Sequence, residues 1–392
     1  MDSSLPLRAN LEWLKKFCKE RLAELRASNP NAKLSDVQFE VAREFGFSTW
    51  PKLKSYVEQL RYELGRLAIA DPAEPPVAPD DPLLHRLMSG IAAGDTGTVI
   101  QLLEHRPVLA RSRDAQGQSP LHLAARYNDP TLCAWLMAYG SDPETVFGES
   151  GHTALSWAVT CNAVECAKTL IRLGAKADLY CAAGAGLIDL VRRSFDESGR
   201  LLPGASRTGS SRIASDGSRL PCPPTSSGEQ LVDALAMACR NGQVETARFL
   251  LSKQPDLSFR AFMGGTPLHW AYFGGSAAVV EQLLQAGADP TLHDDVLKCT
   301  PRAFGIAVAA NWGFGFIVAK LITTDPALVN AVDRHTSPLH EAARGGHTRV
   351  VELLLQHHAD PNFRDSSGKS ACDVASQLGH AEVGELLRRA ST

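Results

Sequence analysis

The feature that most constrains this chain is a short motif that recurs at a nearly constant interval. It consists of a hydroxyl residue, a proline, a leucine and a histidine, and it occupies residues 119–122, 266–269 and 337–340. The hydroxyl can cap a helix, and proline suits the first helical position because the N–H there has no intrahelical partner. Small residues, a turn glycine or asparagine and a second apolar segment follow each motif. The motif therefore predicts helix pairs that repeat along the chain.

Alignment of every unit on the capping position predicts about nine helix-turn-helix repeats. The aligned positions are His85, Ser119, Thr153, Ala177, Asp233, Thr266, Thr300, Ser337 and Ser370. Most intervals lie between 33 and 37 residues, whereas the two on either side of Ala177 are 24 and 56. One such unit has too little apolar surface to fold alone, so its neighbours must cover both of its faces. The chain is therefore expected to form an all-α solenoid over residues 83–390.

The period near 33 residues and the TPLH-type start resemble the ankyrin-repeat family. The resemblance is strongest at GGTPLHWAYFGGSAAVVEQLLQAGADP and TSPLHEAARGGHTRVVELLLQHHADPN. It implies a stack of helix pairs whose turns or hairpins project to one side, and protein binding on the concave side. It also implies that His122, His269 and His340 are structural rather than catalytic.

A separate helical module is expected at residues 1–69. Leu14, Cys18 and Leu22 recur at helical spacing, and Ser35 begins a sequence of the capping-box type. Trp50, Phe45 and Phe47 are expected to pack in the module core, and the alternative is that they are binding aromatics. The stretch AREFGFSTWPKLKSYVE resembles a segment found in bacterial ankyrin-repeat proteins, which suggests a bacterial source. Residues 70–82 contain five prolines among thirteen residues, which predicts an extended linker.

Charge and cysteine content exclude several classes of partner and environment. The formal net charge is −3, so no global basic field favours nucleic acid or an anionic membrane. Nine cysteines, an odd number without a CxxC pair, argue against a disulfide framework and for a reducing compartment such as the cytoplasm. The N-terminus lacks the pattern of a secretory signal. We expect no cofactor, because the sequence contains no recognisable cofactor or catalytic motif.

Two irregular intervals predict departures from a regular stack. The 24-residue interval leaves no room for a projecting hairpin after the third repeat. The 56-residue interval contains an insertion at residues 196–230, in which Gly, Ser and Pro supply 17 of 35 residues. This composition predicts a long irregular or disordered loop. Such a loop is either a functional appendage or tolerated slack, and the sequence leaves both open.

The seventh repeat departs most from the pattern. Arg302 stands at the usual leucine position, and residues 305–319 contain Asn311 as their one polar side chain. The run is shorter than the ~20 residues of a membrane span, so a buried helix pair is expected. An alternative function is an enzyme-like or small-molecule-sensing role, with Arg302 and Trp312 lining a pocket. A buried Arg302 would favour that alternative because it needs a carboxylate or ligand partner, whereas a surface arginine would favour a plain scaffold.

Binding candidates follow from repeat register. In ankyrin folds, the two variable positions after the small pair point into the concave groove. Arginine and aromatic residues at such positions have the composition of interface hot spots, and arginine pairs bidentately with carboxylates. We therefore predict a non-enzymatic scaffold whose partner is another protein with an acidic surface, although ordinary solvent-facing residues would give the same row. The candidates are Arg126, Tyr127, Arg240, Asn241, Phe273 and Arg344.

Three further hypotheses carry less weight. His357, His358 and Asp360 have the residue types of a metal site, but His358 stands where other repeats place a cap glycine, so we expect no metal. Trp270 and Tyr272 occupy positions that pack between repeats and are expected in the core. Self-association is a third possible role for the chain.

Overall fold

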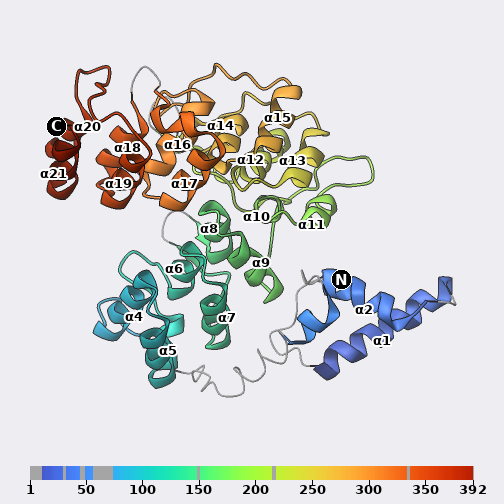
Figure 1. Cartoon of the computed structure of the whole chain (residues 1–392). Coiled ribbons are helices and arrows are strands. Elements are labelled where there is room, and N and C mark those ends of the chain that lie inside the picture. The colour runs from blue at the N-terminus through green and yellow to red at the C-terminus, as the bar shows by residue number, and fades with distance from the viewer. Residues whose placement is uncertain are drawn as a thin grey trace. The chain divides into compact units, whose positions relative to one another are not determined.

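The computed structural model describes residues 11–29, 32–44, 49–55, 74–147, 151–213, 218–332 and 336–391. The regular elements of these residues are helices, apart from one antiparallel pair of β1 (Val146–Phe147) and β2 (His152–Thr153) (Figure 1). The chain forms two compact units, residues 1–177 and 178–392, which we call unit 1 and unit 2. The predicted all-α repeat solenoid is confirmed.

Unit 1 begins with the expected helical module. Helices α1 (Leu11–Ser28) and α2 (Leu34–Glu44) are followed by a third helical segment at residues 50–55. Leu14, Val41 and Leu53 meet in a separate buried core, against which Trp50 packs. The predicted cap at Ser35 is wrong, because α2 begins one residue earlier. The predicted contributions of Phe45 and Phe47 lie outside the described residues.

Three helix pairs follow in unit 1. They are α4 (Pro82–Ala93) with α5 (Thr96–His105), α6 (Pro120–Arg126) with α7 (Pro130–Ala138), and α8 (Ala154–Thr160) with α9 (Val164–Arg172), and the 3-10 helix η1 (Pro107–Arg111) follows α5. Asp81 caps α4, so this repeat begins before the aligned His85. The described part of the proline-rich linker contacts this repeat, because Arg111 Nη2 of η1 donates a hydrogen bond to the Glu74 carbonyl at 2.8 Å.

Unit 2 contains six helix pairs in one continuous core. The first helices pack in series from α10 to α20, and second helices pack beside them. The pairs are α10 (Leu179–Ala185) with α11 (Ile188–Arg193), α12 (Ser227–Arg240) with α13 (Val244–Leu251), α14 (Pro267–Gly274) with α15 (Ala277–Gln285), α16 (Pro301–Asn311) with α17 (Gly315–Thr324), α18 (Pro338–Gly345) with α19 (Thr348–Gln356), and α20 (Ala371–Gln377) with α21 (Ala381–Ala390). Two 3-10 helices, η3 (Phe262–Gly264) and η4 (Pro326–Asn330), join them. The described residues thus contain the nine predicted pairs.

The apolar seventh repeat is the expected buried helix pair, α16 and α17. Ile306, Val308 and Val318 are fully buried there. Within the part of the chain that the structure describes, no helix combines the length and apolar character needed to cross a bilayer. The apolar side chains of α16 and α17 instead fill the space between neighbouring repeats.

The predicted short connection after the third repeat is also confirmed. Only residues 173–178 separate α9 from the start of α10, and they contain no strand. The division between the two units falls in this connection, within the range predicted as a single array. The cap of α10 is Asp178 rather than the aligned Ala177.

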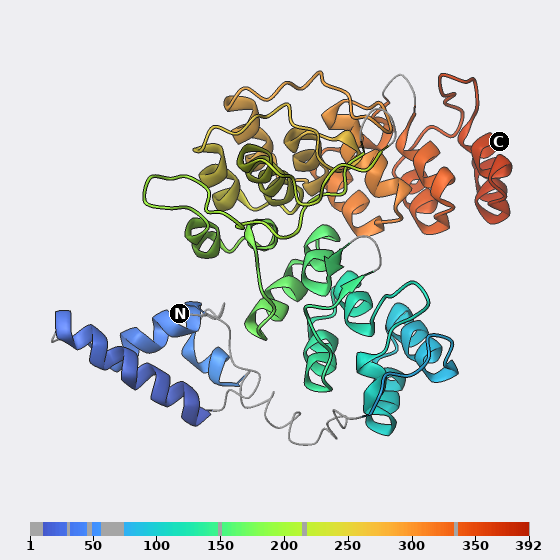
Figure 2. The ribbon, with the colours of Figure 1, turned by 180° about the vertical axis from the view of Figure 1, so that it is seen from behind.

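The insertion is irregular, but its described residues are attached to two buried carboxylates. Asp178 Oδ2 accepts hydrogen bonds from the backbone N–H groups of Arg207 and Thr208 at 2.8 and 2.7 Å. Asp233 Oδ2 accepts one from the N–H of Ser210 at 2.8 Å. The described residues of the insertion are therefore irregular, as predicted, and hydrogen bonds hold them beside α10 and α12 (Figure 2).

The position of Asp233 also corrects the alignment. Asp233 lies inside α12 and is 1% exposed, because Ser226 caps this helix and α12 begins at Ser227, within the predicted insertion. Burial raises the pKa of Asp233 to about 6, and the hydrogen bonds from Ser210 oppose this shift. The residue aligned with the helix caps of other repeats thus anchors the insertion instead.

Close backbone contact between first helices predicts a large effect of one added methyl group. A Cβ on Gly305 of α16 would lie 2.6 Å from the carbonyl carbon of Tyr272 in α14. Gly305→Ala should therefore lower the free energy of unfolding by about 1–3 kcal/mol through overpacking, measured by urea denaturation. Gly315→Ala is the matched control, because its Cβ would meet the nearest atom at 3.8 Å. Equal midpoints for the two variants would contradict the prediction.

Candidate binding surface

Three of the six predicted binding residues lie on the surface. Arg126 ends α6 and Tyr127 follows it, and both are exposed. The Arg126 guanidinium carbon lies 6.0 Å from the centroid of the Tyr127 ring, at the limit of a cation–π contact. Arg344 on α18 has 47% of its side chain exposed, and its Nε lies 3.4 Å from Glu341. These three side chains are accessible to a partner.

The other three predicted residues do not form an exposed row. Arg240 is 3% exposed and Phe273 is fully buried, so neither side chain can meet a partner at the surface. Asn241 is half-buried, and its Nδ2 donates to the Gly184 carbonyl of α10 at 3.0 Å. The prediction is therefore wrong for Arg240 and Phe273, and Asn241 joins two neighbouring repeats.

Arg240 is buried because aromatic rings surround its guanidinium group. The guanidinium carbon lies 4.5 Å from the ring centroid of Trp270, 4.6 Å from that of Phe273 and 5.2 Å from that of Trp312. A desolvated cation–π contact is worth about 2 kcal/mol, so three rings offset part of the cost of burying the charge. We call these four residues the Arg240 cluster.

The sequence did not predict the Arg240 cluster, because the repeat alignment gives the position of a residue along the helix but not the size of the side chains around it. Trp270 was expected in the core, and it is 2% exposed. The sequence signal that would have found the cluster is the unusual concentration of aromatic residues in the sixth and seventh repeats. Trp270 and Phe273 of α14 and Trp312 at the end of α16 cover Arg240 of α12, whose equivalent position is exposed in unit 1.

The pocket proposed at Arg302 and Trp312 is not present in this form. Arg302 has 53% of its side chain exposed, and its Nη2 forms an ion pair with Asp325 Oδ2 at 2.7 Å. The hydrogen bond from Arg302 lowers the pKa of Asp325. Trp312 lies at the other end of α16 and packs in the Arg240 cluster. The buried arginine of this region is thus Arg240, and Arg302 is a surface residue, as expected for a plain scaffold.

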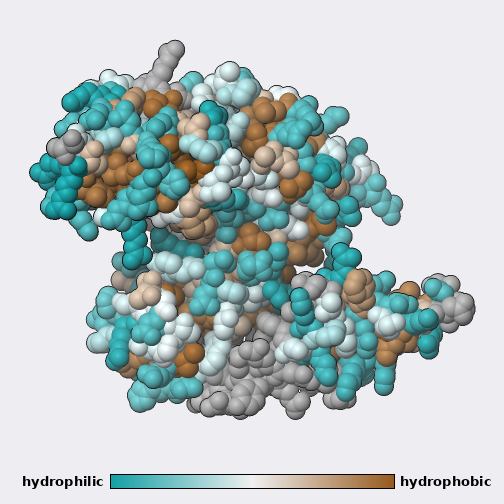
Figure 3. Space-filling model, viewed as in Figure 1, coloured by the Kyte–Doolittle hydropathy of each residue, from teal (hydrophilic) through white to brown (hydrophobic). Residues whose placement is uncertain are grey.

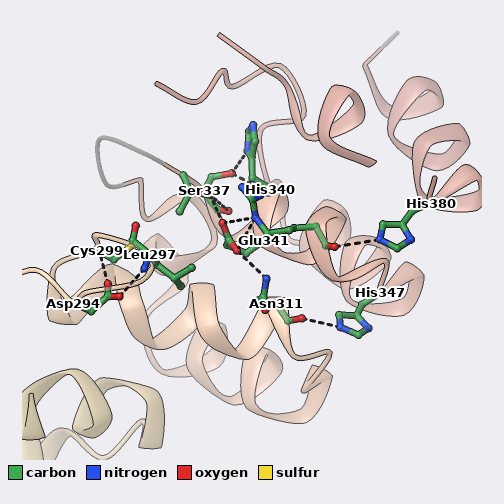
Figure 4. A network of polar contacts seen from close by, with 11 residues as sticks. Asp294, Leu297, Cys299, Asn311, Ser337, His340, Glu341, His347 and His380 are labelled. Atoms are coloured by element: carbon green, nitrogen blue, oxygen red, sulfur yellow. Dashed lines mark hydrogen bonds and ion pairs between the residues drawn. The ribbon is translucent and has the colours of Figure 1, made fainter. Parts of the chain in front are cut away.

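A buried carboxylate links the seventh and eighth repeats. Glu341, 1% exposed, accepts hydrogen bonds from Thr336 Oγ1 at 2.7 Å and from Asn311 Nδ2 at 3.0 Å (Figure 4). The nearby guanidinium of Arg344 pairs with the same carboxylate. All charge on this carboxylate is satisfied within the protein, so it fixes the packing of α18 on α16.

The motif histidines have the same structural role in three repeats. His122 Nδ1 lies 2.7 Å from the Ser119 hydroxyl that caps its own helix, and Nε2 lies 3.1 Å from the carbonyl oxygen of His152. His269 contacts the Cys299 carbonyl and His340 the Lys369 carbonyl in the same way. A carbonyl only accepts, so Nε2 carries the proton and Nδ1 accepts. These buried rings are inaccessible to a substrate.

Further histidines and other donors connect the end of one first helix to the next repeat. His347 Nε2 lies 2.8 Å from the Asn311 carbonyl, and His380 Nε2 lies 3.2 Å from the Arg344 carbonyl (Figure 4). Lys320 Nζ donates to the Gly274 carbonyl at 2.7 Å. The last carbonyls of a helix have no partner within it, so these side chains complete their hydrogen bonding.

The residues considered for metal binding or cysteine chemistry do not converge on a site. No group of three or more metal-binding side chains occurs within the described ranges, and His358 has the left-handed conformation expected at its position, with φ of 66°. Cys133 and Cys166 place their sulfur atoms 3.5 Å apart in the core of unit 1. The hydrogen bond with Cys166, in which the Cys133 thiol donates, and burial raise the pKa of Cys133, which disfavours its reactive thiolate.

An aromatic strip reaches the surface beside the Arg240 cluster. It consists of Trp312 and Phe314, which are half-buried, and Phe316, which is 63% exposed. The ring centroids of Trp312 and Phe314 lie 5.8 Å apart, and those of Phe314 and Phe316 lie 6.0 Å apart. Hydrophobic surface is visible over the region of α16 to α19 in Figure 3.

Comparison with known proteins identifies the repeat type. Residues 87–183, 223–294 and 306–391 match the sequence profile of ankyrin repeats in three copies. The chain is 30% identical over 150 residues to an ankyrin repeat and KH domain-containing protein of Caenorhabditis elegans, with 38% of this chain and 6% of that protein covered. It is 27% identical over 195 residues to a palmitoyltransferase of Mus musculus, with 40% and 30% covered.

A third relative is the mitochondrial disaggregase of Bos taurus, 30% identical over 164 residues, with 41% of this chain and 23% of that protein covered. The chain therefore spans less than a third of the length of these relatives. All three are animal proteins, and they give no support to the expected bacterial source.

The buried Arg240 predicts a structural rather than a surface effect on substitution. Arg240→Ala should lower the free energy of unfolding by about 2–4 kcal/mol, because it leaves a cavity beneath three rings and removes their cation. Urea denaturation followed by tryptophan fluorescence measures this change. Arg248→Ala on the exposed side of α13 is the matched control and should stay within about 0.5 kcal/mol of wild type. An unchanged midpoint for Arg240→Ala would show that the cluster does not stabilise unit 2.

The buried His269 predicts loss of stability in acid. Burial lowers the pKa of His269 to about 4, from 6.5, although its hydrogen bond to the Cys299 carbonyl opposes the shift. Below pH 6.5 the unfolded chain takes up a proton that the folded protein excludes. The contribution of His269 is therefore fully present above pH 6.5 and declines toward pH 4, by up to about 3 kcal/mol.

The variant His269→Gln isolates this contribution in urea denaturation at pH 7 and pH 4.5. Its free energy of unfolding should fall less between these pH values than that of wild type. Asp233, with its pKa raised to about 6, acts in the opposite direction in both proteins and cancels in the comparison. Parallel losses in wild type and variant would rule out His269 as the source.

Proposed function

Because this chain belongs to the ankyrin-repeat family, we propose that it is a non-enzymatic scaffold that binds another protein on the inner face of its repeats. The observation that carries the proposal is the accessible pair at the end of α6. Arg126 and Tyr127 present a guanidinium group and an aromatic ring side by side on the surface of unit 1. This combination is typical of interface hot spots.

The proposed partner has an acidic surface. Arg126 and Arg344 are exposed, and a guanidinium group binds carboxylates bidentately. In the second repeat, Arg126 directly follows the buried small residues Ala124 and Ala125, which fix its backbone against the neighbouring helices. A guanidinium on a rigid element loses little freedom on binding, which favours recognition at this position.

A scaffold rather than an enzyme is supported by the use of the polar groups. The three motif histidines and Glu341 are buried and engaged in hydrogen bonds within the stack. These residue types are the usual general acids and bases, and their assignment to packing leaves them inaccessible to a substrate. We include a reducing, cytoplasmic location in the proposal, since all nine cysteines are free thiols.

Affinity capture from the native host tests this proposal. The protein with Arg126→Ala and Tyr127→Ala should lose a protein that wild type retains, while its circular dichroism stays unchanged. Arg302→Ala is the control, because Arg302 is an exposed arginine at the opposite end of a first helix. Retention of the same protein by the double variant would move the binding site away from α6. Absence of any specifically retained protein would contradict the scaffold role.

A further inference from the structure

The aromatic strip lies at an edge of unit 2 that carries exposed positive charge. Phe316 and Lys320 are four residues apart on α17, both exposed, so they share one face of the helix. Phe316 is the second residue of α17, and the second residue of α19 is the exposed Arg349. Because α17 packs against α19, Arg349 stands at the equivalent place in the next repeat. Cationic side chains thus flank the exposed ring on two sides.

The exposed Glu352 of α19 forms no ion pair with Arg349 among the described residues, and the buried carboxylate of the eighth repeat, Glu341, pairs with neither Lys320 nor Arg349. Glu341 has only 2% of its side chain exposed, and it is already paired with Thr336, Asn311 and Arg344. The second residue of α15, in the preceding repeat, is the small exposed Ala278. The exposed cations that flank the strip without an ion pair to any described residue are therefore Lys320 and Arg349, and the Phe316 ring beside them is 63% exposed.

The position of Phe316 is not required by the fold. At the corresponding position, the five other second helices of unit 2 carry exposed residues, namely Asp189, Glu245, Ala278, Arg349 and Glu382. A phenylalanine at this solvent-facing position adds no packing to the core, and leaving it exposed forgoes the free energy of burying its ring. Behind it, Phe314 and Trp312 connect the ring to the rigid Arg240 cluster. The ring is thus held on a preorganised base.

We propose that Trp312, Phe314 and Phe316, with Lys320 and Arg349, form a second docking surface for an acidic peptide segment of a partner protein that carries aromatic side chains. Aromatic side chains of the segment pack on the strip, and its carboxylates pair with the flanking cations. The inference rests on the proposed function in that the chain binds proteins, but it assigns a different surface, on α17 rather than α6. Charge complementarity selects an acidic segment over a neutral or basic one.

Selection from a random peptide library displayed on phage tests the surface directly. The library is panned on the full-length protein after depletion on the Phe316→Ala variant. Enriched peptides should combine net negative charge with at least one aromatic residue. Enrichment of basic or purely aliphatic peptides, or of no peptide at all, would overturn the proposal.

Binding of an enriched peptide, labelled with a fluorophore, is then measured by anisotropy. Phe316→Ala should weaken it at least about tenfold, and so should Lys320→Glu combined with Arg349→Glu. Salt raised from about 0.1 to 1 M should also weaken it, because the Debye length falls from about 10 to 3 Å. The controls are Phe39→Ala, which removes a 49% exposed phenylalanine of α2, and Arg248→Glu on α13. Equal losses for control and test variants would overturn the proposal.

Two further measurements distinguish a peptide-binding strip from a self-association surface and from the site on α6. If a second copy of this chain covers the strip, light scattering will show a concentration-dependent dimer that Phe316→Ala abolishes, and the proposed peptide partner is then wrong. Peptide binding that is unchanged by Arg126→Ala with Tyr127→Ala distinguishes this site from the inner face of unit 1. Failure of the peptide selection alongside successful capture through α6 would reject the strip and leave the proposed function standing.

Discussion

The contact between the first helix of one repeat and the first helix of the next determines the architecture of this chain. In unit 2 the backbones approach so closely that a Cβ on Gly274 would lie 2.6 Å from the Arg240 carbonyl oxygen. Buried histidines reinforce the same contact, since each bridges its own helix cap and the residue just before the next repeat. A single repeat contains only half of each such bond, which is why the repeats must fold as neighbours.

Polar side chains form hydrogen bonds across the same contact between repeats. The last carbonyls of first helices accept hydrogen bonds from Asn241, Lys320, His347 and His380 of the following repeats. The donors differ chemically, yet each donates to a carbonyl that has no partner within the helix to which that carbonyl belongs. In the insertion the roles are exchanged, because backbone N–H groups donate hydrogen bonds and the buried carboxylates of Asp178 and Asp233 accept them.

Some aromatic residues of unit 2 are buried around Arg240, and others reach the surface. Trp270 and Phe273 enclose Arg240 and remove it from contact with solvent. The same cluster supports Phe314 and Phe316, which continue outward along the start of α17. The exposed aromatic surface of unit 2 thus lies on α17, not in the predicted row of binding residues at the ends of the first helices. In unit 1 the residues of that row, Arg126 and Tyr127, are exposed.

The sequence by itself determined the helix pairs, the missing hairpin after the third repeat and the structural role of the motif histidines. These depend on caps, turns and spacing, which act within about one repeat. It placed Arg240 and Phe273 on the surface and left Arg302 undecided, and it read Asp233 as a helix start. Only the tertiary structure decided these, because the burial of a side chain depends on the volume and charge of residues distant in the sequence. Trp270 and Trp312 bury Arg240, whereas Asp325 holds Arg302 in solvent.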